Sequence, residues 1–136
     1  MKRFLFTALA AAALSATLLM NHQATAQDQP DKAAAAPYRH VVMFKFKDDA
    51  PAEKVKTIVE AFKALKGKLP AVRSLEWGTN VSPEKLNQGF THIFTLTFDS
   101  KEALEKGYLH EPAHKDFGAM LGGVLDKAMV VDYIAQ

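Results

Sequence analysis

Six segments of periodic hydrophobicity, separated by short turns, constrain the fold of this chain more than any other feature. The first segment, YRHVVMFKFK at residues 38–47, alternates with a period of two residues, which is typical of a half-buried strand. An amphipathic helix follows, with Pro51 at its start and Gly67 and Pro70 at its end. The same reasoning predicts three further strands, at residues 72–81 with an interruption at Gly78, at 92–98 and at 124–134. Between the last two lies a helical region. Asp99 caps its start, with Glu102 as the N3 partner, and the region resumes at Pro112 and stops at Gly122.

This order predicts the fold class, an α+β protein with the ferredoxin-like β-α-β-β-α-β sandwich. Both helices of such a fold cover one face of a four-stranded antiparallel sheet. The other face would expose Val41, Met43, Ile93 and Thr95, so we expect two copies to cover each other and form a dimeric α+β barrel.

The N-terminal segment has the form of a secretory signal. Two cations precede an apolar run from Phe4 to Met20, and an A-x-A cleavage site follows at residues 24–26. A retained membrane anchor is the alternative, but the run is short and rich in alanine. We therefore expect a signal peptide at residues 1–26, a disordered linker at 27–37, a single domain at 38–136, and a periplasmic or secreted protein.

Charge and cysteine content narrow the range of partners. The chain has 17 Lys and Arg against 15 Asp and Glu, and Lys2 and Arg3 belong to the predicted signal, so the mature chain has no formal net charge. This balance gives no support for binding nucleic acid, or a membrane after the signal is cleaved. The chain has no cysteine, which excludes disulfides and a lipid anchor on cysteine.

Residues 110–114 read HEPAH and match the H-E-x-x-H pattern of zinc enzymes. That pattern needs a continuous helix, and Pro112 interrupts it because proline lacks an N–H and favours the first turn of a helix. We therefore predict no metal site here and a helix that begins near Pro112.

Several motifs together resemble one family. The strand HVVMFKFK, the segment WGTNVSPE, the strand GFTHIFTLTF, the turn YLHEPAH followed by FG, and the final VVDY are similar to the stress-responsive dimeric α/β-barrel domain, or Dabb, family. The resemblance implies the fold predicted above and association of the chain with itself as a homodimer.

The family includes a polyketide cyclase that performs an aldol-type ring closure without a cofactor. Similarity to that enzyme implies catalytic roles for His114, Tyr108 and His40, and no cofactor. It also implies that a small hydrophobic ligand would contact His92 and a group of apolar residues, which are Val42, Phe44, Ile58, Val59, Phe62, Phe94 and Leu125.

The chemistry of these positions can be argued from the residues. A histidine in the first turn of a helix is kept neutral by the helix dipole, so His114 could act as a base, and Tyr108 could donate to a carbonyl oxygen. His40 and His92 each begin a strand, and we expect both at one end of the sheet, beside an apolar cleft.

Three hypotheses stay open at this point. The one we favour is a module that binds a small hydrophobic carbonyl compound without turnover; the second is a cyclase or aldol-type lyase with His114 as the base. Metal binding through the histidines is the third, and each histidine could also have a purely structural role.

Overall fold

The computed structural model describes residues 36–136. The predicted signal peptide and residues 27–35 of the predicted linker lie outside this range. In the part that is described, the elements follow the predicted order, and the ferredoxin-like α+β fold is confirmed.

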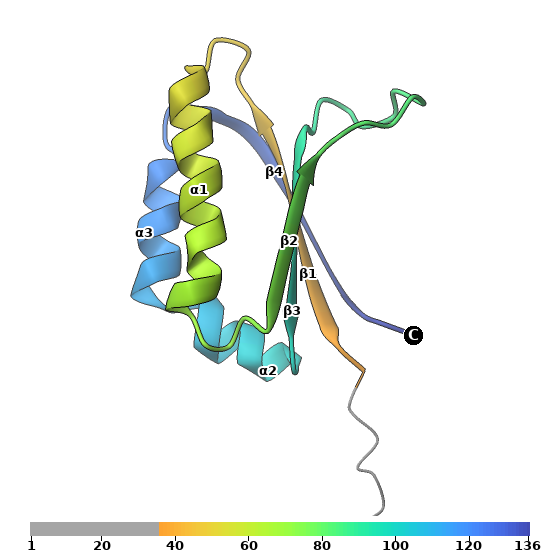
Figure 1. The fold of residues 1–136 in the computed structure, drawn as a ribbon, viewed down its shortest axis with the longest axis vertical. Helices are drawn as coiled ribbons and strands as arrows, with labels where there is room; N and C mark the ends of the chain where they lie inside the picture. The colour runs from red at the N-terminus through yellow and green to blue at the C-terminus, as the bar shows by residue number, and fades with distance from the viewer. Residues whose placement is uncertain (1–35) are drawn as a thin grey trace, which may run out of the picture. The chain divides into compact units, whose positions relative to one another are not determined.

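Four strands form one antiparallel sheet, shown edge-on in Figure 1. Their order is β2-β3-β1-β4, so the first and third strands are central and the second and fourth are at the edges. The strands are β1 (Tyr38–Phe46), β2 (Ser74–Thr79), β3 (His92–Phe98) and β4 (Leu125–Ile134).

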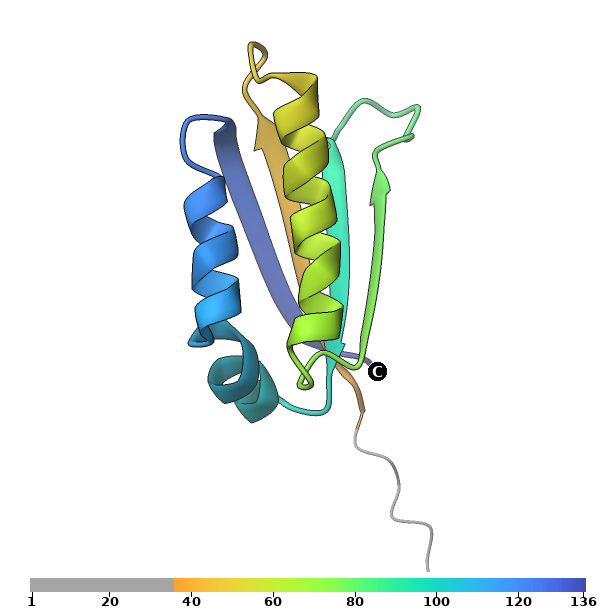
Figure 2. The same ribbon diagram turned by 60° about the vertical axis from the view of Figure 1, so that its left-hand side comes forward.

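The helices lie on a single face of this sheet, as both ribbon views show (Figures 1 and 2). They are α1 (Ala52–Lys68), α2 (Lys101–Leu104), the π-helical turn η1 (Glu105–Leu109) and α3 (Pro112–Met120). None of the helices in residues 36–136 is long and apolar enough to cross a membrane.

The start of α2 differs from the prediction. Ser100, not Asp99, is the N-cap, and its hydroxyl accepts a hydrogen bond from the backbone N–H of Ala103. Asp99 is engaged elsewhere, in an ion pair with Arg73. Both are good capping residues, and helix boundaries assigned from sequence are commonly displaced by one residue.

The core lies between the helices and the face of the sheet that they cover, which we call the inner face. Rings from three elements interlock there: Phe62 of α1 stacks on Phe94 of β3 with centroids 4.1 Å apart, and Phe117 of α3 meets Phe62 edge-on at 4.9 Å. Each fully buried side chain of this size contributes roughly 1.5–3 kcal/mol. This packing fixes the helices on the sheet.

The opposite face, which we call the outer face, carries none of the helices of residues 36–136. The register aligns its residues in three rows across β2, β3, β1 and β4. On β4 these side chains are 38–47 % exposed, although they are large and apolar. The rows are Ser74, Thr97, Arg39 and Tyr133; Glu76, Thr95, Val41 and Val131; and Gly78, Ile93, Met43 and Met129.

Candidate functional site

Three residues that the sequence singled out converge under the helices, at one end of the sheet. His40 comes from β1, Tyr108 from η1 and His114 from α3. The Tyr108 ring lies between the two imidazoles, with its centroid 5.6 Å from that of His40 and 4.5 Å from that of His114. The chain therefore assembles two imidazoles and a phenol in one contiguous group.

A fourth residue, Asp132, joins this group and was missed by the sequence analysis. Its carboxylate oxygen Oδ1 lies 2.6 Å from Nδ1 of His40, whose side chain is almost fully buried. A carboxylate accepts here, so Nδ1 carries the proton and Nε2 is left toward the rest of the site when the ring is neutral. No local sequence pattern reveals this contact, because it follows from the pairing of β1 with β4, which places His40 opposite Asp132.

Tyr108 is completely buried, and its hydroxyl has no hydrogen-bond partner among the described residues. Burial raises the pKa of this phenol far above its ordinary value of 10.0, so the group stays protonated. Leaving a buried hydroxyl unpaired costs roughly 1–3 kcal/mol. Such an orphaned donor is a feature that a ligand oxygen would satisfy.

The local backbone brings Tyr108 to this position. The π-helical turn η1 is a short widened segment of a type found often at functional sites. Gly107, next to the tyrosine, packs against Ala71, and a Cβ at this glycine would lie 2.6 Å from the Ala71 Cβ. The glycine therefore permits the close approach of η1 to the turn after α1.

His114 lies in the first turn of α3, which begins with Pro112 as predicted. Its Nδ1 is 3.3 Å from the carbonyl oxygen of Leu109, and a carbonyl can only accept, so the proton is on Nδ1 and Nε2 has a free lone pair. Burial lowers the pKa of this imidazole; the hydrogen bond to the Leu109 carbonyl opposes this in part, and the nearby His40 has the smallest effect and also lowers the pKa. A half-buried ring that is neutral near pH 7 can act as a general base.

His92 does not belong to this group, which corrects our expectation. Because β1 and β3 are antiparallel, His92 pairs with Phe44 while His40 pairs with Leu96. Four strand residues separate the two histidines along the sheet, about 13 Å at the usual rise per residue. His92 instead contacts the ring of Phe46 at 5.1 Å and the hydroxyl of Thr91 at 2.9 Å, and burial lowers its pKa.

The cleft that we expected beneath the helices is filled by side chains. The residues proposed to line it pack against one another in the core, and Phe62 and Phe94 are in stacked contact. Contact of these residues with a ligand stays a prediction. Those in the core are Val42, Phe44, Ile58, Val59, Phe62 and Phe94, with Leu125 half-buried beside them.

The HEPAH segment is divided between two elements. His110 is the exposed residue that ends η1, and Pro112 is the first residue of α3, so the two histidines do not share a helix. Within residues 36–136, no group of three or more histidine, aspartate or glutamate side chains is placed to hold a metal ion.

Comparison with known proteins gives a consistent result. The chain is 40 % identical over 100 residues to stress-response A/B barrel domain-containing protein HS1 of Arabidopsis thaliana, covering 74 % of this chain and 91 % of that protein. It is 30 % identical over 95 residues to olivetolic acid cyclase of Cannabis sativa, covering 70 % and 93 %.

A solved structure of a dimeric protein of unknown function with a ferredoxin-like fold, from Bacteroides fragilis, is also similar. Its TM-score is 0.59 at 26 % identity, over 73 % of this chain and 96 % of that one. The model of the stress responsive A/B barrel domain, Dabb, matches residues 38–135, which include all the strands and helices described above. The chain therefore belongs to the Dabb family of stress-responsive A/B barrel domains.

Proposed function

We propose that this protein catalyses cofactor-independent proton transfer next to a carbonyl group, in a reaction of the aldol-type cyclase or lyase class. The observation that carries the proposal is Tyr108: its ring lies between two imidazoles, and its buried hydroxyl lacks a partner within residues 36–136. The sequence alone favoured ligand binding without turnover. The assembled site, together with 30 % identity to olivetolic acid cyclase, changes that preference.

The geometry of the site supports one assignment of roles. His114 takes a proton from the carbon beside the carbonyl through its free Nε2, which leaves an enolate. Tyr108 donates its hydrogen bond to the carbonyl oxygen as negative charge develops there. The enolate carbon then forms a bond to a second carbonyl carbon, and the imidazolium of His114 returns the proton to the new alkoxide.

His40 and Asp132 support this reaction as positioning residues. The hydrogen bond between them fixes the tautomer and the orientation of the His40 ring, which in turn packs against Tyr108. The ring of Phe98 also meets both His40 and Tyr108 edge-on. The phenol is therefore held on several sides before a substrate binds.

Packing of the core limits the size of the substrate. A long acyl chain beneath the helices would have to separate Phe62 from Phe94, whose centroids are 4.1 Å apart. Of the three predicted catalytic residues, His114 is the one that solvent reaches. We therefore propose that the substrate is a small carbonyl compound that approaches from the His114 side. The apolar core residues would limit the depth of the site and would not enclose a long acyl chain.

Exchange of hydrogen for deuterium at a ketone tests the proposal without knowledge of the natural substrate. A simple probe is 2-heptanone in deuterated buffer, followed by proton NMR with wild type, His114→Ala and Tyr108→Phe. The proposal expects exchange faster than in buffer for wild type only. Binding of the ketone with exchange at the buffer rate would instead support the module that binds a carbonyl ligand without turnover.

We also propose that the protein is a homodimer in which the outer faces of two copies meet. The support is the uncovered apolar surface on β4 and β1 and the dimeric description of the Bacteroides fragilis relative. Light scattering after size exclusion measures the mass directly. A monomer at micromolar concentration would contradict this assembly.

Export to the periplasm or the medium remains a proposal that rests on the N-terminal sequence. The A-x-A site at residues 24–26 predicts a mature chain that begins at Gln27. The intact mass of the protein recovered from its native host would show the loss of residues 1–26. A full-length mass would favour the retained anchor.

A further inference from the structure

Among the described residues, the three rows of the outer face carry one cation and one anion, while the next row along β1 and β4 consists of Lys45 and Lys127. Arg39 of β1 is in the first row, beside Thr97 and Tyr133, and Glu76 of β2 is in the second row, beside Thr95. Within residues 36–136, neither charge forms an ion pair. Both side chains point to the surface that the proposed homodimer would cover.

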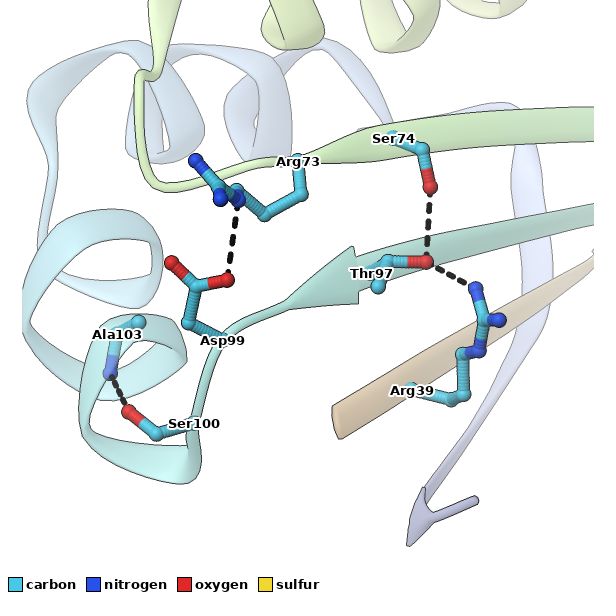
Figure 3. Close-up of polar contacts among 7 residues, drawn as sticks. All are labelled: Arg39, Arg73, Ser74, Thr97, Asp99, Ser100 and Ala103. Carbon is cyan, nitrogen blue, oxygen red and sulfur yellow. Dashed lines mark hydrogen bonds and ion pairs between the residues drawn. The ribbon is translucent and has the colours of Figure 1, made fainter. Parts of the chain in front are cut away.

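Arg39 has an incomplete set of partners. Its guanidinium donates to the hydroxyl of Thr97, which also accepts a hydrogen bond from the Ser74 hydroxyl at 2.8 Å (Figure 3). A neutral hydroxyl does not balance the charge, and a guanidinium has five N–H donors. Water supplies the remaining interactions of Arg39 as long as the face is uncovered.

A second arginine in the same region shows what Arg39 lacks. Arg73 lies just before β2 and pairs with the carboxylate of Asp99 at 3.0 Å, as Figure 3 also shows. Arg73 is more than half exposed, so its ion pair contributes little. Arg39 is half-buried before any partner binds, yet it has no carboxylate.

Docking of a second copy would remove water from Arg39. A charge that loses its water needs an opposite charge, because an unpaired buried ion is strongly unfavourable. Within the three rows of described residues the single carboxylate is that of Glu76, and the chain's own Glu76 is one row and two strands away from Arg39. The remaining candidate is the same residue on the other copy.

We propose that Arg39 forms an ion pair with Glu76 of the partner subunit, and that two-fold symmetry repeats this pair on the other side of the interface. This inference rests on the proposed homodimer. In an isologous interface a contact from one residue to another is always made twice, so one pair of opposite charges on a face is self-complementary. The two pairs fix the orientation in which the sheets meet and discriminate against related chains that lack one of the charges.

Charge reversal provides a test that separates pairing between subunits from pairing within one chain. Arg39→Glu and Glu76→Arg each place two like-charged pairs in a homodimer. We expect each variant to raise the Kd for dimerisation at least tenfold, measured by sedimentation equilibrium. The double variant carries both reversals and should return to within a few-fold of the wild-type value.

Mixing the two single variants gives the most specific result. A heterodimer of Arg39→Glu with Glu76→Arg has opposite charges at both sites, so it should form in preference to either homodimer. Pairing within one chain would allow the double variant to recover but would give no gain on mixing. Absence of preferential heterodimer formation would therefore overturn the proposal.

Two controls test whether the changes in Kd come from the ion pair between subunits. Arg73→Ala removes an arginine of the same region whose partner is in its own chain, and it should leave the Kd unchanged. If a reversed variant fails to fold by circular dichroism, Glu76→Gln removes the charge with little change of shape and should still weaken the dimer. A Kd unaffected by Glu76→Gln in a dimeric wild type would contradict the ion pair alone, whereas a monomeric wild type would contradict the homodimer itself.

Discussion

The two faces of the sheet differ although they are built from the same strands. On β1, Val42 and Phe44 are buried against the helices, while Val41 and Met43, which alternate with them, lie on the uncovered face. Neighbouring residues thus have similar hydrophobicity and different surroundings. Burial in this protein is decided by the position of the helices, not by the composition of the strand.

The faces also differ in how they treat polar groups. On the inner face His40 is hydrogen-bonded to Asp132 of its own chain, and the Tyr108 hydroxyl has no partner among the described residues, one that a substrate oxygen can supply. On the outer face Arg39 finds only a hydroxyl. The buried histidine of the inner face is thus paired within its own chain, whereas the half-buried arginine of the outer face has no carboxylate among residues 36–136.

The largest effect is expected from opening the core on the inner face. Phe94→Ala removes a fully buried ring that stacks on Phe62, and substitutions of this kind lower the free energy of unfolding by about 3–5 kcal/mol. Thr95→Ala changes the next residue on the outer face and should cost below about 1 kcal/mol. Urea denaturation at one protein concentration compares the two, and equal losses would show that the outer face is packed as tightly as the core.

The fold could be predicted from the sequence because the alternation in residues 38–47 and 92–98 and the helical period after Pro51 are local signals. All four strands and the start of α3 at Pro112 were predicted in the right order. The strand predicted at residues 72–81 is shorter, Ser74–Thr79, since its first residues form a turn in which the Val72 N–H donates to the Leu69 carbonyl.

The candidate site was predicted only in part, because its assembly depends on strand pairing. The family resemblance pointed to His40, Tyr108 and His114, and the structure brings them together. Asp132 was missed since its contact with His40 follows from the register of β1 and β4, which no local pattern reveals. The expectation for His92 failed for the same reason, because antiparallel pairing places the starts of β1 and β3 at opposite ends.

The next largest effect is expected from blocking the outer face. A Cβ added at Gly78 meets no atom within 4 Å, so Gly78→Lys leaves the isolated fold unstrained while it places a cation in the third row. We expect the Kd for dimerisation to rise about 100-fold, equivalent to about 2.7 kcal/mol. Gly67→Lys on α1 is the matched control, since a Cβ there also meets nothing and its surface lies away from the sheet. If Gly78→Lys and Gly67→Lys raise the Kd for dimerisation equally, the dimer interface is not on the outer face.

A smaller effect on stability, combined with loss of activity, is expected at Tyr108. Tyr108→Phe removes a buried hydroxyl that has no partner in the described part of the chain, so the free energy of unfolding should stay the same or rise by about 1 kcal/mol. Exchange at the ketone should fall roughly 100-fold, the usual loss for one donor to a developing oxyanion. Loss of stability with unchanged exchange would instead indicate a structural role for the phenol.

The smallest effect is the pH dependence that His114 adds to stability. Burial and the nearby His40 lower the pKa of the folded imidazole below its unfolded value of 6.5, so the unfolded chain binds more protons once the pH drops through that value. Folding stability should therefore decrease as the pH falls below 6.5 and level off once the folded imidazole is also protonated.

His114→Gln should reduce the loss of folding stability between pH 7.5 and 5, as measured by thermal unfolding. His92, whose pKa burial also lowers, accounts for part of the pH dependence that remains. The exposed His110 gives the matched control, His110→Gln. Because His114 lies on the inner face, its substitution should leave the dimer Kd unchanged at pH 7.5. If the dependence of folding stability on pH is the same in His114→Gln as in wild type, the wild-type His114 imidazole is solvated and protonated as in the unfolded chain. His114 would then lack the buried environment that keeps a general base neutral.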